Sequence, residues 1–185
     1  MHVMHAIDAV TVTLNPAIDQ TLLIREFAAD RVNRVEDVSA RPGGKGVNVA
    51  AALADFRCAV AVTGFLGRDN AESFDAMFAG RRIADHFIRV PGQTRTGIKI
   101  CDPVRRQTTD INFPGLAPRR SDVAAMTRLL EQLAVPGRWF VLSGSLPPGT
   151  APELYARLVA LLRRRGAKIL VDTSGEPLRH AVDEQ

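Results

Sequence analysis

The sequence predicts an α/β fold in which a mostly parallel sheet is flanked by helices. Short runs of Val, Ile and Leu alternate along the chain with longer stretches in which apolar residues recur at helical spacing. Strand–helix alternation of this kind is typical of a parallel sheet covered on both faces. The 185 residues, 46% hydrophobic and 24% charged, are enough for one full core. We therefore expect a single domain over residues 1–185 and exclude collagen-like, disordered and disulfide-rich classes.

Strands are predicted where short β-branched or apolar runs are bounded by turn residues. The core strands expected on this basis are residues 9–14, 59–63, 139–142 and 168–171. Residues 21–24 and 34–39 are short and partly polar, so they indicate edge or lid strands. Three more segments are spaced as a meander: residues 86–90, 97–101 and 108–112.

Helices are predicted from apolar spacing and from capping signals. The expected helices cover residues 47–56, 69–79, 123–133, 154–165 and 176–185. Two of them begin with the capping-box pattern, at Asp69-x-x-Glu72 and Thr150-x-x-Glu153. The run Arg163-Arg164-Arg165 closes the fourth helix, where cations complement the negative end of the helix dipole.

Charge and composition argue against nucleic-acid and membrane partners. The net charge is only +4, and no basic stripe with interleaved aromatic residues accompanies it. No apolar run approaches the roughly 18 residues that span a bilayer, and no secretory signal pattern begins the chain. Cys58 and Cys101 fall in separate apolar segments. We expect buried thiols and a cytoplasmic protein.

Four turns that follow predicted strands are the candidate ligand-binding positions, because ligands of open α/β sheets bind beyond the carboxyl ends of the strands. These turns are residues 15–19, 43–48, 143–149 and 172–175. We find no metal-ligand spacing in them or elsewhere in the sequence.

The segment Gly43-Gly44-Lys45-Gly46 opens a predicted helix, where free N–H groups and missing Cβ atoms let a polar ligand approach the main chain. It is neither a Walker A loop nor a G-x-G-x-x-G motif. Asn48 can present both a donor and an acceptor to a sugar hydroxyl. On these residues alone, a glycine-rich helix start with a solvated Asn is an equally good interpretation.

Other candidate residues carry weaker signals. Asp19 can accept hydrogen bonds from vicinal hydroxyls, although Asp is also common in turns for local bonding. Arg95 offers a planar fork suited to phosphate, or is an exposed residue of an edge strand. Ser143-Gly144-Ser145 precedes a rigid Pro-Pro-Gly turn that holds small hydroxyls at the sheet edge. It does not fit G-x-S-x-G, so a serine hydrolase is excluded.

Taken together, these segments resemble the ribokinase-like PfkB carbohydrate kinase family, most closely its 1-phosphofructokinase branch. The segments that carry the resemblance are TLNPAID (13–19), VNRV (32–35), GGKGVNVA (43–50), GFLGRDN (64–70), TRTGIKI (94–100), TDINFPG (109–115), SGSLPPG (143–149) and VDTSGE (171–176). The resemblance implies a ribokinase-like sheet with a small β lid, built within about residues 20–41 and 87–113, that closes over the sugar and makes a homodimer contact.

The resemblance also implies an activity and a set of site residues. The activity is transfer of the ATP γ-phosphoryl group to the 6-hydroxyl of fructose 1-phosphate, with Mg²⁺ as the usual companion of ATP. Asp19, Gly44 and Asn48 are implied to hold sugar hydroxyls, Arg95 to engage the phosphate, and Ser145 to line the same pocket. The implied substrate-binding set is Asp19, Gly43, Gly44, Lys45, Asn48, Arg95 and Ser145, with Asp172 in the Mg-ATP network.

The sequence departs from the family in one respect. The family's base Asp lies in a G-A-G-D segment that residues 1–185 do not contain, and its N-x-x-E magnesium segment is expected beyond Gln185. We therefore expect a truncated chain without a catalytic residue or metal site, inactive and not binding ATP by itself. The alternatives are a tagatose-6-phosphate kinase or 6-phosphofructokinase, and a non-catalytic sugar-phosphate-binding remnant.

Overall fold

The computed structural model describes residues 7–183, so the first six and last two residues of the expected domain lie outside it. Its main sheet is parallel, with the strand order β10-β9-β1-β4-β5, and β6 pairs with β4 off this path. The strands are β1 (Ala9–Thr13), β4 (Val60–Gly67), β5 (Ala84–Asp85), β6 (Ile88–Val90), β9 (Trp139–Ser143) and β10 (Lys168–Asp172). The predicted α/β class with a mostly parallel sheet is confirmed.

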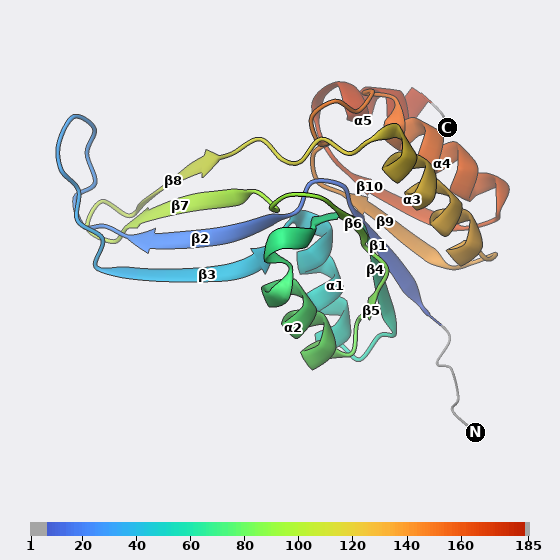
Figure 1. Ribbon diagram of the computed structural model, residues 1–185, viewed down its shortest axis with the longest axis horizontal. Helices are drawn as coiled ribbons and strands as arrows, with labels where there is room; N and C mark the ends of the chain where they lie inside the picture. The colour runs from blue at the N-terminus through green and yellow to red at the C-terminus, as the bar shows by residue number, and fades with distance from the viewer. Residues whose placement is uncertain (1–6, 184–185) are drawn as a thin grey trace.

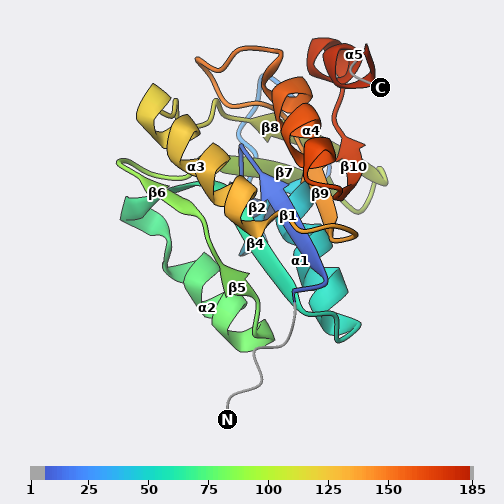
Figure 2. The same cartoon turned by 90° about the vertical axis from the view of Figure 1, so that its right-hand side faces the viewer.

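Helices cover both faces of this sheet, as its apolar strands require (Figure 2). The helices are α1 (Lys45–Asp55), α2 (Glu72–Arg81), α3 (Arg120–Leu133), α4 (Leu154–Arg164) and α5 (Gly175–Asp183), with a short 3-10 turn η1 (Arg68–Asn70) before α2. One core layer joins α3 and α4 to side chains such as Phe140 and Leu142. The other joins α1 and α2 to Val60 and Val62. Burial of each such side chain contributes about 1.5–3 kcal/mol.

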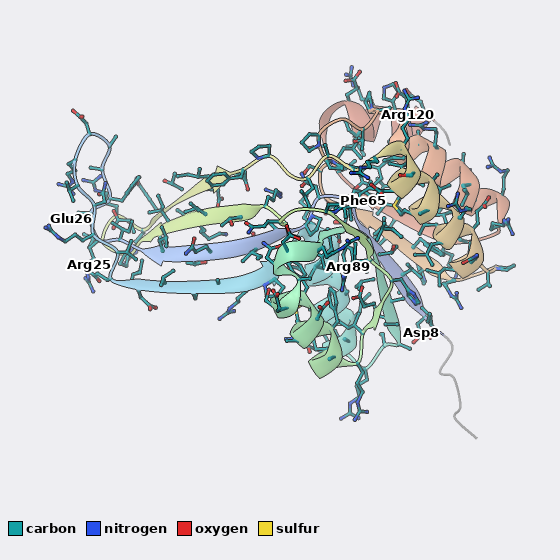
Figure 3. The ribbon with its side chains drawn as sticks, in the orientation of Figure 1. Asp8, Arg25, Glu26, Phe65, Arg89 and Arg120 are labelled. Atoms are coloured by element: carbon teal, nitrogen blue, oxygen red, sulfur yellow. The ribbon has the colours of Figure 1, made fainter. Side chains whose placement is uncertain are left out.

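A second sheet of four strands extends away from the main sheet, and we call it the arm (Figure 1). Its order is β3-β2-β7-β8, with β2 (Ala17–Leu23), β3 (Asp37–Gly43), β7 (Thr96–Asp102) and β8 (Gln107–Asn112). The β2–β7 pair is parallel and the other two pairs are antiparallel. Figure 3 shows Arg25 and Glu26 at the far end of the arm, well away from Phe65 in the main sheet.

Side chains alternate between the two faces of the arm, because successive residues of a strand point to opposite sides. One face is polar and includes Asp19, Thr21, Lys99, Asp110 and Asn112. The opposite face is mainly apolar and includes Ile18, Leu22, Val38, Ile98 and Ile111. The arm is therefore amphipathic, with its polar face on the side of Asp19.

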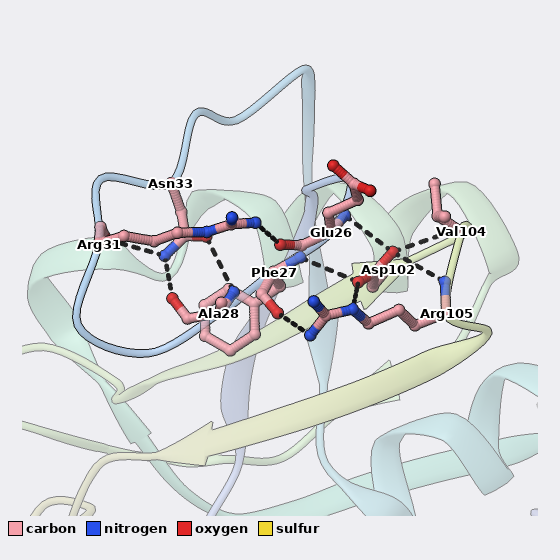
Figure 4. A network of polar contacts seen from close by, with 8 residues as sticks. All are labelled: Glu26, Phe27, Ala28, Arg31, Asn33, Asp102, Val104 and Arg105. Carbon is pink, nitrogen blue, oxygen red and sulfur yellow. Dashed lines mark hydrogen bonds and ion pairs between the residues drawn. The ribbon is translucent and has the colours of Figure 1, made fainter.

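The tip of the arm is held together by the buried carboxylate of Asp102 (Figure 4). It accepts hydrogen bonds from the backbone N–H groups of Glu26 and Phe27, and from those of Val104 and Arg105 in the β7–β8 turn. Burial opposes ionisation of this carboxyl, but the four N–H donors outweigh it and lower the pKa of Asp102 below its usual value. The network ties the loop of residues 24–36 to the β7–β8 turn.

Two predictions about the middle of the chain are wrong in part. The predicted meander forms only in part: β7 and β8 pair antiparallel as expected, but Ile88–Val90 pairs in parallel with β4 of the main sheet and not with β7. The lid strands expected at residues 21–24 and 34–39 lie instead at Ala17–Leu23 and Asp37–Gly43. β2 pairs with β3 on one side and with β7 on the other, and this pairing extends the strand through Asp19 and Gln20. These two polar residues interrupt the apolar pattern from which the strand was predicted.

Both predicted capping boxes are also wrong. The turn η1 includes Asp69, and the N-cap of α2 is Ala71. The Thr150 hydroxyl donates to the Pro147 carbonyl, and α4 begins only at Leu154, beyond Pro152, which disfavours helical backbone before it.

The prediction that both cysteines are buried is wrong. Cys58 and Cys101 are free thiols but only half-buried. Among residues 7–183, each helix is too short or too polar to cross a lipid bilayer.

Candidate functional site

A polar hollow of about 460 Å³ lies where the arm joins the carboxyl edge of the main sheet. Strand order reverses here, because the chain moves from β1 to β4 on one side and later to β9 and β10 on the other. Such a switch point is where ligands of open α/β sheets bind. Six of the predicted site residues line this hollow: Asp19, Gly44, Lys45, Asn48, Arg95 and Ser145. Gly43 contacts Asp19, and Asp172 contacts Lys45.

The Asp19 carboxylate lies in a space that only glycines leave open. A Cβ atom at Gly43 would lie 2.0 Å from Asp19 Oδ2, and one at Gly97 would lie 3.0 Å from Oδ1. Burial raises the pKa of the Asp19 carboxyl, and the nearby charges of Arg95 and Lys99 only partly offset this. Within the described part of the chain no hydrogen bond to this carboxylate is found. A partly desolvated, unbonded carboxylate can accept hydroxyl groups from a ligand.

The Arg95 guanidinium connects the arm to the turn after β1. Its Nε donates to Asn15 Oδ1 at 3.1 Å, and its Nη2 donates to the Asn15 carbonyl at 3.3 Å. Its Nη1 donates to Asn112 Oδ1 and to the Phe113 carbonyl, both at 3.4 Å. Burial lowers the pKa of Arg95, and Asp19 opposes this shift. None of these hydrogen-bond acceptors is charged, so the positive charge is left for an anionic ligand.

Helix α1 begins directly at the hollow. Its N-cap, Gly44, has a φ of 110° and no capping side chain. A Cβ atom at Gly44 would lie 2.9 Å from Thr13 Cγ2, and one at Gly46 would lie 2.4 Å from Thr13 Oγ1. The glycines therefore let the first turn pack against β1. The first N–H groups of a helix have no acceptor within it, which leaves them for a polar ligand beside Asn48.

Asp172 is bonded to two side chains at the edge of the hollow. Its Oδ2 accepts from Ser143 Oγ at 2.8 Å and its Oδ1 accepts from Lys45 Nζ at 3.1 Å. The Ser143 hydrogen bond, and then that from Lys45, hold the pKa of Asp172 below its usual value. The contact joins the start of α1 to β9 and β10. Asp172 thus orients Lys45, a role that the sequence did not indicate.

Asn112 and Phe113 line the hollow but lie outside the four candidate turns, and Asn15 lies in one of these turns but was not in the predicted binding set. Asn15 donates to Ser145 Oγ at 3.1 Å while accepting from Arg95, so it bridges two predicted residues. The turn signal Asn15-Pro16 and the segment INFPG were the available clues. Neither clue indicates that these segments meet, because the contact depends on the packing of the arm.

Potential metal-ligating side chains are scattered over the described residues. Among residues 7–183, no three His, Cys, Asp or Glu side chains gather closely enough to hold a metal ion. The string Asn33-Arg34-Val35-Glu36 fits the letters N-x-x-E, but Glu36 pairs with Arg25 at 3.1 Å and Asn33 bonds to Ala28 in the tip loop.

Another hollow, of about 430 Å³, lies between α4, α5 and β10. Its lining is mainly apolar, with side chains such as Ile169, Leu178 and Val182. Arg163 also lines it, but the described residues of its lining include no carboxylate and no helix start. The polar hollow is therefore the candidate site.

Comparison with known proteins agrees with this geometry. A model of the pfkB family of carbohydrate kinases matches residues 6–184. The chain belongs to the pfkB family. It is 48% identical over 173 residues to a 1-phosphofructokinase of Rhodobacter capsulatus, and 45% identical over 177 residues to one of Xanthomonas campestris. These matches cover 93% and 96% of this pfkB chain but 55% and 56% of the relatives, so it spans about half of their length.

Solved structures support the pfkB fold. The crystal structure of a Thermotoga maritima protein described as "Possible 1-phosphofructokinase" is 32% identical, with a TM-score of 0.86, over 95% of this chain and 56% of that one. Phosphofructokinase-2 of Escherichia coli in complex with fructose-6-phosphate has a TM-score of 0.88 at 24% identity, over 96% of this chain and 58% of its own. The second likeness concerns the fold alone.

Replacing Asp19 by Asn should stabilise this pfkB chain at neutral pH. The folded-state pKa of Asp19 is raised, so the charged carboxylate costs stability above that pKa, and the cost vanishes as the pH falls below the unfolded value of about 3.9. We expect Asp19→Asn to raise the melting temperature at pH 7 by at most about 4 °C and to have no effect at pH 3.

The matched control for this experiment is Asp37→Asn, which changes an exposed carboxylate on the same sheet. It should leave the melting temperature unchanged at both pH values. A lower melting temperature for Asp19→Asn at pH 7, or a difference that persists at pH 3, contradicts the account of this carboxylate.

Proposed function

We propose that the polar hollow binds a phosphorylated ketose, fructose 1-phosphate, as the phosphoryl acceptor of a kinase of the 1-phosphofructokinase type. The observation that carries the proposal is the pairing of Asp19 with Arg95 across one hollow. An unbonded carboxylate suits sugar hydroxyls, and a guanidinium without a carboxylate partner suits a phosphate. The names of the relatives support the same choice of sugar.

The start of α1 completes the proposed sugar site. The main-chain N–H of Gly44 and the side chain of Asn48 offer donors at the part of the hollow where α1 begins. Ser145 offers a hydroxyl that is already oriented by Asn15. Directional polar groups from three turns fix a polyhydroxylated ligand in one orientation, which is the main requirement for in-line phosphoryl transfer.

These residues supply the acceptor part of the proposed reaction. ATP bound with Mg²⁺ would supply the γ-phosphoryl group: the sugar 6-hydroxyl would give its proton to a base and bond to the γ-phosphorus as the bond to the ADP leaving group breaks. Asp19 and Asn48 orient the sugar, and Arg95 holds its phosphate. Residues 1–185 contain no G-A-G-D segment for the base Asp. We therefore propose binding of the sugar phosphate, without turnover, by these residues alone.

Two alternatives to this proposal remain testable. The first is a different phosphoketose, such as fructose 6-phosphate or tagatose 6-phosphate, since the hollow alone does not specify which carbon carries the phosphate. The second is a non-catalytic sugar-phosphate-binding protein. It has the same acceptor site and no affinity for ATP, so tight ATP binding would count against it.

Calorimetric titration tests the proposed ligand. We expect fructose 1-phosphate to bind with a dissociation constant below about 1 mM, the upper range for metabolic substrates. The two 6-phosphates and unphosphorylated fructose should bind at least about tenfold more weakly. Arg95→Lys should weaken fructose 1-phosphate binding by about tenfold or more, because the ammonium group cannot replace the planar fork.

Arg120→Lys is the matched control, because Arg120 is exposed on α3 and does not line the hollow (Figure 3). It should leave the affinity unchanged. Absence of saturable binding by the native chain, or equal affinity for fructose and fructose 1-phosphate, overturns the proposal. Tighter binding of a 6-phosphate favours the first alternative.

We further propose that the arm acts as the lid and joins two copies of the chain through its apolar face. Val38 is 53% exposed and Ile111 is 45% exposed on that face. Both residues lie in outer strands, so the apolar face extends across the whole width of the sheet. An apolar face of this extent in a single-layer sheet is buried favourably against a second copy.

Sedimentation velocity tests the proposed dimer. The native chain should sediment as a dimer at tens of micromolar, and Ile111→Asp as a monomer, because a buried unpaired charge is costly. Val104→Asp is the matched control, since Val104 is 53% exposed in the turn at the arm tip. A monomeric native chain, or equal sedimentation of Ile111→Asp and native protein, contradicts the dimer.

A further inference from the structure

Arg95 by itself offers too few free donors for a phosphate group. A guanidinium has five N–H donors. Four hydrogen bonds to neutral acceptors already engage Arg95, two to Asn15 and one each to Asn112 and Phe113. If each bond uses one N–H, a single donor remains. A bidentate grip on phosphate, which is the geometry that makes Arg effective, therefore requires breaking contacts that hold the arm in place.

Lys99 is a second cation on the same face of the arm. In β7 it lies two residues beyond Gly97. A Cβ atom added at Gly97 would lie 3.0 Å from Asp19 Oδ1, so Gly97 and Asp19 are on the same face of the arm. Residues two apart in a strand share a face, at about 7 Å along the strand. The positive charge of Lys99 acts on Asp19, as does that of Arg95. Lys99 does not line the hollow in the free protein, but its flexible four-carbon stem carries three donors on the same face of the arm as Asp19.

The partner of Lys99 in the structure holds it only loosely. Asp110 lies directly opposite in β8, and its Oδ1 is 3.8 Å from Lys99 Nζ, which is an ion pair but beyond hydrogen-bond distance. The Lys99 side chain is 49% exposed and that of Asp110 is 55% exposed. Exposed pairs of this kind contribute only about 0–1 kcal/mol. A phosphate dianion competes with Asp110 easily.

Charge balance around Asp19 also requires a second cation. A ligand whose hydroxyls bond to Asp19 brings its phosphate near a carboxylate, and Asp110 adds a further negative charge on the same face. One guanidinium does not neutralise this arrangement together with a doubly charged phosphate, and Lys45, the other cation among the described residues that line the hollow, is paired with Asp172. Lys99, released from Asp110, supplies the missing positive charge.

We propose that Lys99 is a second phosphate-binding residue of the sugar-phosphate site and that Asp110 competes with the ligand for it. This inference rests on the proposed function, and it adds a residue that sets the preference for a phosphorylated over an unphosphorylated sugar. In the free protein Asp110 holds the ammonium group, and in the complex the phosphate of fructose 1-phosphate takes its place.

Substitutions of Lys99 and of Asp110 should change the affinity of the full chain for fructose 1-phosphate in opposite directions, as measured by calorimetric titration. Lys99→Ala should weaken fructose 1-phosphate binding by about tenfold and change fructose binding by less than about twofold. Lys99→Arg, which keeps the charge, should restore most of the affinity. Asp110→Asn should tighten fructose 1-phosphate binding by about two- to fivefold, and this gain should disappear in the Lys99→Ala background.

Lys168→Ala is the matched control, because Lys168 lies over the Trp139 ring in the main sheet, outside the hollow. It should not change either affinity. The proposal is overturned if Lys99→Ala stays within twofold of the native protein, if it weakens fructose equally, or if Asp110→Asn tightens binding regardless of Lys99. Failure of the native chain to bind fructose 1-phosphate overturns the proposed function as well, whereas loss of affinity with Arg95→Lys but not with Lys99→Ala overturns this inference only.

Discussion

The contact between Arg95 and Asn15 is the constraint on which the candidate site depends. It joins the first residues of the arm strand β7 to the turn after the central strand β1. Through Asn15 the same contact reaches Ser145 after β9, and through Asn112 and Phe113 it reaches the end of β8. Three segments that are distant in the sequence are thereby brought to one hollow. Together with the direct passage of β3 into α1, this contact fixes the polar face of the arm relative to the start of α1.

Folding and binding make opposite demands at this hollow. Asp19 is partly desolvated, and residues 7–183 provide it with no hydrogen-bond donor, which costs stability in the free protein. The glycines at positions 43 and 97 keep its carboxylate free of steric contact. A half-buried carboxylate that lines a hollow and has no donor among the described residues is suited to a binding site that a ligand completes. Asp172 shows the contrary case, because Ser143 and Lys45 satisfy it within the protein.

The sequence predicted the main sheet better than it predicted the arm. Apolar periodicity reflects burial, so the strands and helices of the main sheet stood out, as did the helix whose face includes Leu154 and Leu158. Arm strands alternate between a polar and an apolar face, and pairing with neighbours rather than apolar character determined their extent. Only the β7–β8 part of the predicted meander formed for this reason, since nothing local shows that β7 also pairs with β2 and that Ile88–Val90 pairs with β4. Asp19 and Arg95 were recognised by residue type, whereas Asn15 and Lys99 required the three-dimensional arrangement.

The central claim is that one hollow between the arm and the sheet edge binds the sugar phosphate. The most direct measurement is an NMR titration of the isotope-labelled chain with fructose 1-phosphate. The account predicts saturable shifts that are largest at the amides of Gly44 and Asn48 and at the Arg95 Nε–H. Shifts centred instead on Leu178 and Val182, in the apolar hollow between α4 and α5, would contradict it.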